Sequence, residues 1–549
     1  MRVAYDPRME MHWATVWESI ADVVGDRPAV TNGTVTRSWS DYEDRAARIA
    51  AAYIAAGLGP NSKIALYLYN GNEYMEAQFG AFKMRGVPVN VNYRYLDNEL
   101  LYLLENSDAE ALVYHSSLAD RVARVAGSLP GIRLLVEVDD TGTAGVSVEG
   151  AVAFEDLITG HDPMPRITRE ESDIYMLYTG GTTGMPKGVM YATGEITQFF
   201  CGLGFPAIGL PVPEAAADIA GVVAGVHERG ESAVSLVGAP LMHGTGLWLG
   251  ALIPHLGGGH LVTLTSRSLD PHEVLGTISM RRATHVTIVG DSFAKPIISA
   301  IDEAADRSEA YDLTSVKMVL SSGVMWTSEV KEAMLDRLPQ VFLYDAMGSS
   351  EGSMGSQISM RGMSTATARF SANPTTKLFD ENDREITPGS DEIGRVAAGG
   401  LVPLGYFKDP EKSAATFREI DGVRYSFPGD MGQILEDGTL VLLGRGSQVI
   451  NSGGEKIFPE EVEEAVKRVD GVIDCLVVGV DDEKFGQTVT AVLSGSSEVT
   501  PESVIAGVKD QLAGFKAPRH IVIVDTVPRA PNGKADYQAA RELAVAALS

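Results

Sequence analysis

The sequence predicts an α/β fold with a large first domain and a smaller α+β domain behind it. Helix-like periods alternate with short apolar runs over most of the first 370 residues, and shorter strands and turns follow as far as Gly444. A compact pattern of helices and strands, about 100 residues long, then ends the chain. The length of 549 residues also exceeds what one hydrophobic core normally supports, which favours two or more domains.

Between Trp39 and Val113 the apolar pattern predicts βα units. The segment SDYEDRAARIAAAYIAAGLG has the period of a helix, whereas KIALYLY and EALVYH are short apolar runs bounded by Gly, Asn or Pro. This alternation is typical of a mainly parallel sheet with helices between its strands.

The same pattern resumes beyond Gly188. The runs ESAVSLVGAP, GHLVTLT, THVTIVG and VKMVLSSG predict strands, and SEVKEAMLDRL predicts one of the intervening helices. Residues 203 to 235 are rich in Gly, Ala and Pro, and we expect them to form an irregular excursion that shapes a pocket.

From Phe370 to Gly444 shorter strands predict a mixed or antiparallel subdomain, with a hairpin in EDGTLVLLGR that turns at Asp437-Gly438. Beyond Arg445, Pro459 and the acids behind it predict the start of a helix. The segments DCLVVGV, PESVIAGVKDQLAG and HIVIVD then predict a strand, a helix and a strand, which together have the size of an independent domain.

Composition narrows the classes of partner. A formal charge of −28 disfavours nucleic acid and anionic membrane surfaces, so any anionic substrate must meet a local cluster of cations. Cys201 and Cys475 lie far apart without Cys or His neighbours at ligand spacing, which argues against a disulfide framework and a structural zinc. The N-terminus lacks a signal-peptide pattern and no uncharged apolar run reaches about 18 residues, so we expect a cytoplasmic protein without a transmembrane segment.

Residues 178–188 read YTGGTTGMPKG and follow the apolar run IYML, so a strand leads into a loop of glycines and hydroxyls. Backbone N–H groups, threonine hydroxyls and one lysine ammonium can together hold a polyphosphate. The Walker A spacing is not met, because Pro186 and Gly188 stand where that motif requires Gly and Ser or Thr. The pattern predicts a phosphate-binding loop of another kind, with a flexible surface loop as the alternative. Its candidate ligands are Thr179, Gly180, Gly181, Thr182, Thr183, Gly184 and Lys187.

This loop resembles that of the adenylate-forming superfamily, the group that contains acyl-CoA synthetases, firefly luciferase and the adenylation domains of peptide synthetases. The usual loop has Ser where this chain has Gly180. Further matches follow in the family's order from about Trp17 through Lys534, including GVPVNVN at residues 86–92. The resemblance implies a large adenylation domain of several subdomains, with a distorted β-barrel, over residues 1–445. It also implies a small mobile C-terminal domain over residues 446–549.

The sequence MGSSE at residues 347–351 stands where the family has an aromatic residue, Gly, any residue, Thr and Glu. The resemblance implies that Glu351, with Thr183, binds Mg²⁺, that Ser350 contacts phosphate, and that Met347 covers the adenine ring in place of the aromatic. The other candidates for the nucleotide site are Ser322, Gly323, Val324, Gly348 and Ser349.

The remaining matches lie towards the C-terminus. Asp430 in YSFPGD resembles the family's ribose-binding carboxylate, and Arg445 resembles an arginine near ribose and α-phosphate. Lys534 in PRAPNGK resembles the lysine that is catalytic in adenylation, so the implied catalytic set is Lys534, Glu351 and Arg445. Gln448 falls at the hinge, where the family commonly has an acid. The hairpin implied to line the CoA tunnel comprises Ser452, Gly453, Gly454 and Glu455.

The segment PLMHGTG resembles the family segment that borders the acyl pocket, which implies that His243, Gly244, Thr245 and Gly348 contact the acyl group. The long excursion before it, with GSSEG and NSGGEKIFPEEVEE, is most similar to actinobacterial fatty-acyl and steroid side-chain CoA ligases. The resemblance therefore implies an ATP-dependent acid:CoA ligase that uses ATP, Mg²⁺ and coenzyme A. Its acid would be a medium- or long-chain fatty acid or a steroid side-chain carboxylate.

Several alternatives stay open. A stand-alone adenylation enzyme would pass the acyl group to a carrier protein, and an amino-acid adenylation domain would need an acid near PLMHGTG, where none is seen. A serine hydrolase would use GSSEG as a nucleophile elbow, which requires a helix directly after the serine. A non-catalytic nucleotide-binding protein would be expected to lack some of the charged residues named above. The oligomeric state is also open, with a homodimer among the alternatives.

Overall fold

The computed structural model describes residues 11–142, 146–179, 185–207, 210–363, 365–452, 455–482, 485–530 and 534–548. The chain divides into two compact units. The first comprises Met1–Gly352, Ile358–Thr365 and Leu401–Arg418, and the second comprises Ser353–Gln357, Ala366–Gly400 and Glu419–Ser549. The domain boundary expected between residues 445 and 446 lies inside the second unit and stays a prediction.

A five-stranded parallel sheet in the first unit has the strand order β4-β3-β5-β6-β7. Its strands are β3 (Lys63–Tyr67), β4 (Val87–Asn90), β5 (Ala109–His115), β6 (Leu134–Val138) and β7 (Val152–Ala153). The helices around it are α2 (Trp39–Ala55), α3 (Asn72–Lys83), α4 (Asp97–Asn106), η2 (Ser116–Leu118), α5 (Ala119–Ala126) and α6 (Phe154–Thr159).

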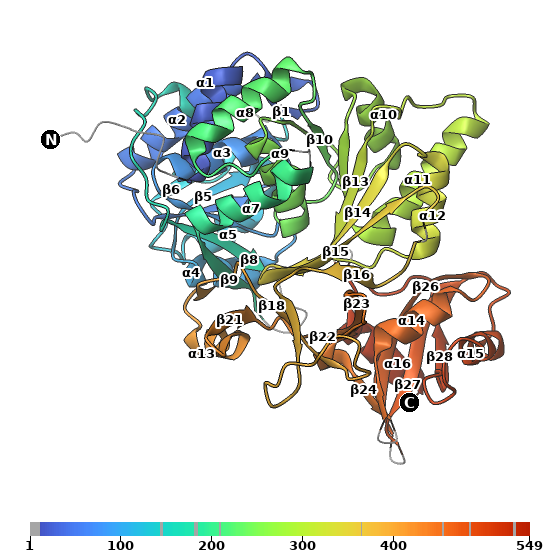
Figure 1. Cartoon of the computed structure of the whole chain (residues 1–549). Helices are drawn as coiled ribbons and strands as arrows, with labels where there is room; N and C mark the ends of the chain where they lie inside the picture. The colour runs from blue at the N-terminus through green and yellow to red at the C-terminus, as the bar shows by residue number, and fades with distance from the viewer. Residues whose placement is uncertain are drawn as a thin grey trace. The chain divides into compact units, whose positions relative to one another are not determined.

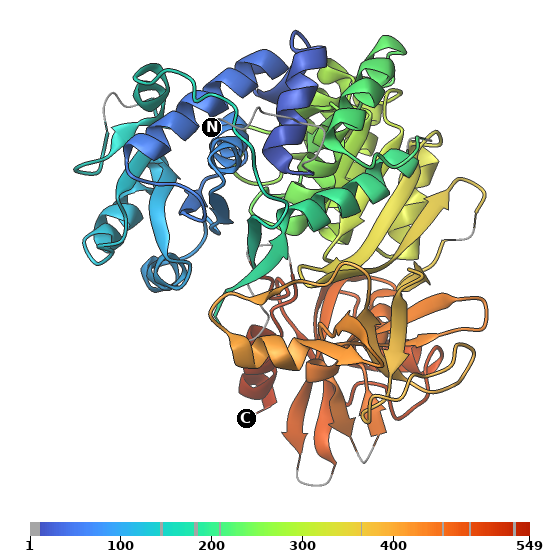
Figure 2. The same cartoon turned by 60° about the vertical axis from the view of Figure 1, so that its left-hand side comes forward.

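Alternate side chains of this sheet enter different cores. Ile64 and Leu66 belong to the core that contains α2 and α3, whereas Ala65 and Tyr67 belong to the core that contains α4 and α5. Helices therefore cover both faces, as Figures 1 and 2 show. Helix α2 begins at Trp39 because Ser38 and Asp41 form a reciprocal capping box in front of it. The predicted βα units are confirmed.

A second sheet in the first unit has the order β2-β1-β11-β10-β12-β13-β14 and is parallel except for β2. Its strands are β1 (Pro28–Asn32), β2 (Val35–Ser38), β10 (Val234–Val237), β11 (His260–Thr263), β12 (His285–Ile288), β13 (Met318–Ser322) and β14 (Phe342–Ser349). One face packs on α10 (Pro271–Arg281), α11 (Gly290–Asp306) and α12 (Ser328–Arg337), which lie beside β13 and β14 in Figure 1.

The other face of this sheet is covered by helices that include a segment predicted to be irregular. These helices are α1 (Trp13–Val24), α7 (Thr193–Ala207), α8 (Ala216–Glu228), η3 (Thr245–Leu252) and α9 (Ile253–Leu256). The expectation of an irregular excursion over 203–235 is therefore wrong for most of its length. The alanines of α8 favour helix, and its buried Ile219, Val223 and Val226 recur at helical spacing.

A small antiparallel sheet in the first unit has the order β19-β9-β8. Its strands are β8 (Ile174–Thr179), β9 (Lys187–Ala192) and β19 (Gly405–Tyr406), and the helix α13 (Pro410–Thr416) follows β19. The sheet joins a segment near residue 180 to one near residue 405, which is how two distant parts of the sequence meet at the site described below.

An antiparallel sheet of short strands lies mostly in the second unit, although residues 352, 358–360 and 417–418 of its strands belong to the first. The strands between residues 352 and 445 are β15 (Gly352–Met360), β16 (Arg369–Ala372), β17 (Thr376–Phe379), β18 (Gly394–Ala398), β20 (Phe417–Ile420), β21 (Val423–Ser426), β22 (Asp430–Ile434) and β23 (Thr439–Arg445). Strands β22 and β23 form the predicted hairpin, and Gly438 has φ +84° in its turn. Within the described residues the order β16-β23-β22-β18-β21 is an open path, so the expected barrel is seen as an open sheet.

The C-terminal part of the second unit has a sheet in the order β25-β24-β27-β26, with β28 paired to β27. Its elements are η4 (Gly446–Gln448), β24 (Ile450–Ser452), β25 (Glu455–Ile457), α14 (Pro459–Lys467), β26 (Val472–Asp482), β27 (Gly486–Gly495), α15 (Pro501–Lys509), β28 (His520–Ile523) and α16 (Tyr537–Leu548). Pro459 is the first residue of α14, as predicted. No helix in the described part of the chain is both long and apolar enough to cross a membrane.

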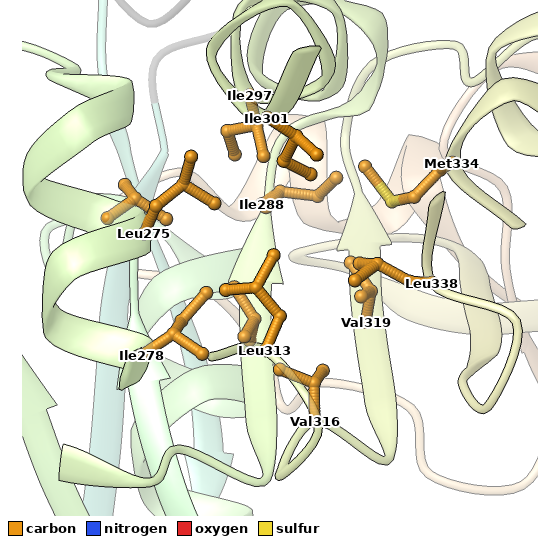
Figure 3. A pocket seen from close by; sticks show the side chains of 12 residues that line it. Leu275, Ile278, Ile288, Ile297, Ile301, Leu313, Val316, Val319, Met334 and Leu338 are labelled. Carbon is orange, nitrogen blue, oxygen red and sulfur yellow. The ribbon is translucent and has the colours of Figure 1, made fainter. Parts of the chain in front are cut away.

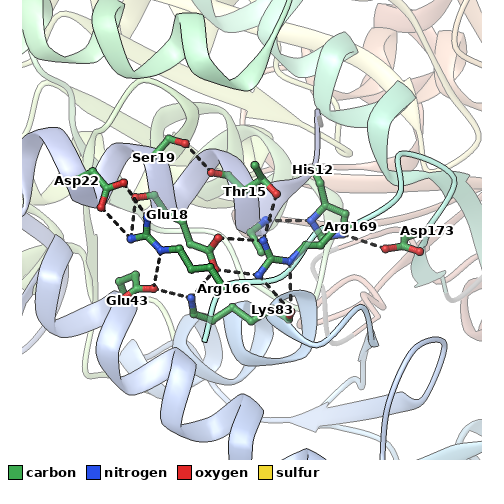
Figure 4. Close-up of polar contacts among 11 residues, drawn as sticks. His12, Thr15, Glu18, Ser19, Asp22, Glu43, Lys83, Arg166, Arg169 and Asp173 are labelled. Carbon is green, nitrogen blue, oxygen red and sulfur yellow. Dashed lines mark hydrogen bonds and ion pairs between the residues drawn. The ribbon is translucent and has the colours of Figure 1, made fainter. Parts of the chain in front are cut away.

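A buried ionic cluster in the first unit ties α1 to the end of α3 and to the segment before β8 (Figure 4). The Glu18 carboxylate accepts hydrogen bonds from Lys83 at 2.6 Å and from Arg169 at 2.8 and 2.9 Å. Burial alone would raise the pKa of Glu18, but the charges of Arg169 and Lys83 outweigh it and lower the pKa to about 2. The cluster therefore holds the segment that leads into β8.

Candidate functional site

The predicted phosphate loop lies between two paired strand ends. Thr179 is the last residue of β8 and pairs with Lys187, the first residue of β9. Residues 180–184, which include the predicted ligands Gly180, Gly181, Thr182, Thr183 and Gly184, lie outside the described residues. The structure thus brings the two ends of the loop together, and Lys187 is the first residue after the loop that belongs to a strand.

Glu351 and its neighbours are held by two tyrosines from the small sheet. The Tyr406 hydroxyl donates to Glu351 Oε1 at 2.9 Å, and the Tyr191 hydroxyl donates to the Ser350 carbonyl at 2.8 Å. Tyr406 is 7% exposed and Tyr191 is 2% exposed, so both phenols are anchored by packing. They fix the turn between β14 and β15 and the direction of the Glu351 carboxylate.

Lys187 lies beside the same tyrosine. Its Nζ is 5.2 Å from the centre of the Tyr406 ring and 3.5 Å from Asp409 Oδ2. Asp409 also accepts the backbone N–H of Lys412 and so caps α13. Tyr406 therefore lies between the Lys187 ammonium and the Glu351 carboxylate. The ammonium is suited to bind an anion and the carboxylate is suited to bind a metal ion.

Glu351 fits the carboxylate ligand of a Mg²⁺ ion. Mg²⁺ is usually held in nucleotide sites by one or two carboxylates together with substrate phosphates. Among the described residues, Oε1 of Glu351 accepts from Tyr406 and Oε2 has no hydrogen-bond donor. The carboxylate thus keeps one oxygen for a further ligand.

Asn90 connects the loop strand to the segment PLMHGTG. Its amide nitrogen donates to the carbonyls of Tyr178 at 2.8 Å and Met242 at 2.7 Å, and its amide oxygen accepts the N–H of Tyr178 at 2.7 Å. One buried side chain therefore fixes the end of β8 next to His243. His243 is half-buried and its carbonyl accepts from Leu247 at the start of η3.

The segment after His243 contacts the end of β13. The Thr245 hydroxyl donates to the Ser322 carbonyl at 3.3 Å, and Gly244 precedes it at the start of η3. Gly323 has φ +87°, and a Cβ there would stand 3.4 Å from Thr245 Oγ1, so glycine suits this turn. Val324 follows directly. The structure thus brings the predicted acyl and adenine segments together.

The segment 347–350 ends β14 and begins the turn after it. Met347 is 5% exposed, Gly348 is exposed, and Ser349 and Ser350 are half-buried. Gly348 therefore offers more surface here than Met347. The strand β15 follows this turn, not a helix, so GSSEG lacks the strand–turn–helix geometry of a nucleophile elbow.

A cavity of about 130 Å³ lies on the face of β12, β13 and β14 that is covered by α7, α8, η3 and α9. Its lining residues are Leu203, Gly204, Phe205, Val226, Glu231, Ala233, Leu249, Ile253, Pro254, Gly257, His285, Met318, Leu320 and Tyr344. The expectation that residues 203–235 shape a pocket is therefore confirmed, although they do so as helices.

The strand register relates this cavity to the predicted site. Leu320 pairs with Tyr344, and two residues further along Ser322 pairs with Ala346. Side chains two apart in a strand share a face, so the cavity lies on the face of Ser322 and about 7 Å from it along the strands.

A second cavity lies on the opposite face, among α10, α11 and α12 (Figure 3). It measures about 20 Å³, and the side chains drawn around it carry only carbon and sulfur. This is room for about one water, without a polar partner to hold it. It is a packing gap in the core and no ligand site.

In the second unit Asp430 and Arg445 pair across the β22–β23 hairpin. Arg445 Nε lies 3.3 Å from Asp430 Oδ1, and Asp430 is 8% exposed. The Arg445 N–H donates to Glu460 Oε1 at 3.3 Å. Gly444 has φ +115°, and a Cβ there would stand 2.0 Å from Glu460 Oε2, so only glycine allows this approach. Burial, reinforced by Glu463 and Asp430, raises the pKa of Glu460 to about 8.

The predicted CoA and catalytic residues also lie in the second unit. Ser452 pairs with Glu455 across the β24–β25 hairpin, and Gly453 and Gly454 lie outside the described residues. Lys534 is half-buried, and its carbonyl accepts the N–H of Ala530 at 2.8 Å. Ser452, Glu455 and Lys534 belong to the second unit, whereas Thr179 and Lys187 at the ends of the phosphate loop belong to the first.

Four residues of the site were not predicted from the sequence. Tyr191, Tyr406 and Asp409 support Glu351 and Lys187, and Asn90 positions the loop strand. Asn90 stands in GVPVNVN, and Tyr406 and Asp409 stand in LGYFKDP before a helix that starts at a proline. These patterns were visible, but their partners are far away in the sequence.

Comparison with known proteins agrees with this geometry. Residues 17–407 match the model of AMP-binding enzymes, and residues 461–534 match that of the AMP-binding enzyme C-terminal domain. A 3-oxocholest-4-en-26-oate–CoA ligase of Rhodococcus rhodochrous is 36% identical, covering 97% of this chain and 96% of its own length. A medium/long-chain-fatty-acid–CoA/3-oxocholest-4-en-26-oate–CoA ligase of Mycolicibacterium smegmatis is 37% identical, covering 97% of each chain.

Among solved structures, an anthranilate CoA ligase in complex with anthranoyl-AMP has the same fold, with a TM-score of 0.82 at 20% identity and 99% of both chains covered. The predicted α/β fold and the predicted superfamily are confirmed. With a family match over most of its length and relatives above 30% identity along nearly all of it, the chain belongs to the AMP-binding, adenylate-forming enzymes.

Proposed function

We propose that this enzyme joins a carboxylic acid to coenzyme A at the expense of ATP, through an acyl-adenylate, with release of pyrophosphate and AMP. The observation that carries the proposal is the Tyr406 bridge. Its ring lies beside Lys187 at the end of the phosphate loop and its hydroxyl donates to Glu351, so a cation and a carboxylate flank one rigid group. The named relatives are CoA ligases, which bears out the predicted class of acid–thiol ligase with ATP and CoA as substrates.

The chemistry requires cations at the α-phosphate. A carboxylate resists attack by a thiol because oxide is a poor leaving group, so it first displaces pyrophosphate from ATP and AMP then becomes the leaving group. Negative charge gathers on the phosphate oxygens in the first step, and preorganised positive groups stabilise it. We assign this role to Lys534 and Arg445, and the outer phosphates to Lys187 and the loop.

Mg²⁺ is the metal that we propose for Glu351, with Thr183 as a second ligand. When bound, the ion neutralises phosphate charge. The protein's own contribution is to direct the carboxylate through the Tyr406 hydroxyl. Asp430, beside Arg445, is suited to accept hydrogen bonds from the ribose hydroxyls, because a carboxylate accepts from a diol without competing donors.

The two half-reactions need different groups at one site. We propose that the small C-terminal domain turns about Gln448 after adenylation, withdraws Lys534 and presents the hairpin of Ser452, Gly453, Gly454 and Glu455 to CoA. In this proposal the adenylate stays bound to the first unit, and the C-terminal domain presents first the surface that carries Lys534 and then the surface that carries the hairpin.

The acid is proposed to be bulky and mostly apolar. Most residues that line the 130 Å³ cavity are apolar, and the cavity lies on the same face of the sheet as Ser322. A cavity of about 150 Å³ holds a benzene ring, so this slightly smaller cavity is close to the size that a single ring requires. A steroid side-chain acid or a long fatty acid, the substrates named for the relatives, would require α7 and α8 to part further.

We further propose that the enzyme acts in the cytoplasm, where ATP and CoA are available. The two cysteines, Cys201 and Cys475, are buried and free, which suits a reducing compartment. The homodimer remains a prediction.

A pyrophosphate-release assay tests the proposed function. Purified enzyme with ATP and Mg²⁺ is given short, medium, long, aromatic and steroid carboxylates, each with and without CoA. We expect acid-dependent release of pyrophosphate, greatest with apolar acids, and a thioester product identified by mass when CoA is present. Release that no acid stimulates contradicts the proposal.

A further inference from the structure

Lys534 lies on a short hairpin, which we call the lysine hairpin and which comprises the described residues between 528 and 536. The Ala530 N–H donates to the Lys534 carbonyl at 2.8 Å. One residue further out on each arm, Arg529 and Ala535 form an antiparallel bridge. The two arms are therefore tied to each other, so whatever holds Arg529 also holds the main chain at Lys534.

Arg529 anchors the lysine hairpin to β26 through a forked ion pair. Its Nε donates to Asp474 Oδ2 at 2.9 Å, and its Nη2 donates to Asp474 Oδ1 at 2.6 Å. Lys467 of α14 places a second cation 3.4 Å from Asp474 Oδ1. Two N–H groups on one planar guanidinium fix the direction of the contact as well as its distance. The Asp474 carboxylate therefore determines where this arm of the lysine hairpin lies.

Apolar packing on both sides of the lysine hairpin anchors this part of the fold. Val527 before the hairpin and Ala540 of α16 behind it are buried, and both share a core with Leu476 of β26. The side chains of Arg529 and Asp474 are 26% and 28% exposed, and a partly exposed ion pair contributes little to stability. The pair is thus better suited to orienting the hairpin than to holding the domain together.

The orientation of the hairpin matters because a lysine carries its charge at the end of a flexible side chain. A cation stabilises a transition state best when it is already in place before the reaction begins. A displacement of about 1 Å in a reacting group costs up to about 100-fold in rate. Fixing the main chain at Lys534 removes part of the freedom that would otherwise displace its ammonium.

We propose that Asp474 is a positioning residue for Lys534, and that it acts through Arg529 by holding the lysine hairpin in the orientation that adenylation requires. The inference rests on the proposed function and adds a residue that acts on the reaction through another side chain. Because Lys534 is proposed to withdraw before CoA reacts, loss of this positioning should slow adenylation alone. Loss of a merely structural contact should slow both half-reactions.

The test replaces Asp474 with Asn in the full-length enzyme, which keeps the size of the side chain and removes its charge. We expect acid-dependent exchange of labelled pyrophosphate into ATP to fall by about 10-fold, part of the loss that a 1 Å displacement causes. CoA transfer from supplied acyl-adenylate should stay within about 2-fold of wild type. Arg529→Lys, which keeps the positive charge but not the fork, should slow exchange by a smaller factor.

Asp481→Asn is the matched control, because Asp481 lies in the same strand and pairs with Arg541 at 2.9 Å, outside the lysine hairpin. It should change neither rate by more than about 2-fold. In the Lys534→Ala background Asp474→Asn should cause little further loss of exchange, because no lysine is left to position.

The inference is overturned if Asp474→Asn slows exchange no more than the control does, if it slows both half-reactions equally, or if it slows exchange by the same factor without Lys534. If the wild type shows no acid-dependent exchange, the proposed function fails, and hydrogen–deuterium exchange then decides the inference. The Ala530 amide should exchange at least about 10-fold faster in Asp474→Asn than in the control, and equal protection overturns the inference.

Discussion

Replacing Tyr406 with Phe removes one hydroxyl and keeps the ring beside Lys187. The hydroxyl donates to Glu351 at 2.9 Å, and a hydrogen bond to a charged group contributes about 1.5–3 kcal/mol. Tyr406 is 7% exposed but Glu351 is half-buried, so a water molecule can replace part of the lost hydrogen bond. The expected loss is therefore near the lower value, about 1.5 kcal/mol. Since about 1.4 kcal/mol is tenfold in rate, we expect kcat/KM for ATP in acid-dependent pyrophosphate release to fall by about 10-fold.

Measuring the second half-reaction distinguishes a loss of Glu351 positioning from general damage to the fold. Thiolysis of a supplied acyl-adenylate by CoA needs no pyrophosphate site, so Tyr406→Phe should leave that rate within about 2-fold of wild type, well inside the loss expected for the first step. Tyr53→Phe is the control, because Tyr53 is 1% exposed and its hydroxyl has no hydrogen-bond partner among the described residues. If the two variants release pyrophosphate equally fast, Tyr406 does not position Glu351.

Two further predictions concern stability. Glu18→Gln leaves Arg169 buried without its counter-charge, while Lys83 keeps Glu43, so the urea midpoint at pH 7 should drop by the equivalent of about 3–5 kcal/mol. Because the pKa of Glu18 is lowered from 4.5 to about 2, its contribution is full above pH 4.5 and is lost as pH falls towards 2, so the variant should approach wild type there. The pKa of Glu460 is raised from 4.5 to about 8, so the folded state keeps a proton that the unfolded chain loses, and stability falls as pH rises across that range. Between pH 6 and pH 8 the free energy of unfolding of Glu460→Gln should therefore decrease by about 2 kcal/mol less than that of wild type, measured by urea unfolding at both pH values. The same decrease in both proteins would contradict this.

The elements that local sequence specifies were predicted correctly. The helix over Trp39–Ala55 was predicted from the helical period of its apolar residues, and the hairpin at Asp437-Gly438 was predicted from a turn pair that suits a positive φ. The helix α8 was missed because glycine and proline nearby suggested an irregular segment, while its alanines and apolar spacing favoured helix.

The supports of the site depend on sheet assembly and could not be predicted locally. Tyr406 meets Glu351 55 residues away, and Asn90 meets Met242 152 residues away. Both contacts exist only because β8, β9 and β19 pair in one small sheet and the end of β8 adjoins PLMHGTG. The chemical groups of the site were recognisable in the sequence, but the residues that orient them could be identified only once the fold was known.

We propose that Lys534 acts on the phosphate in adenylation and not in thioester formation. The direct measurement compares Lys534→Ala with wild type in acid-dependent exchange of labelled pyrophosphate into ATP and in CoA transfer from supplied acyl-adenylate, with Lys509→Ala, an exposed lysine of α15, as the control. We expect Lys534→Ala to lose about 100- to 1,000-fold in pyrophosphate exchange and far less in CoA transfer. Equal losses in both half-reactions, or exchange that survives without Lys534, would contradict it.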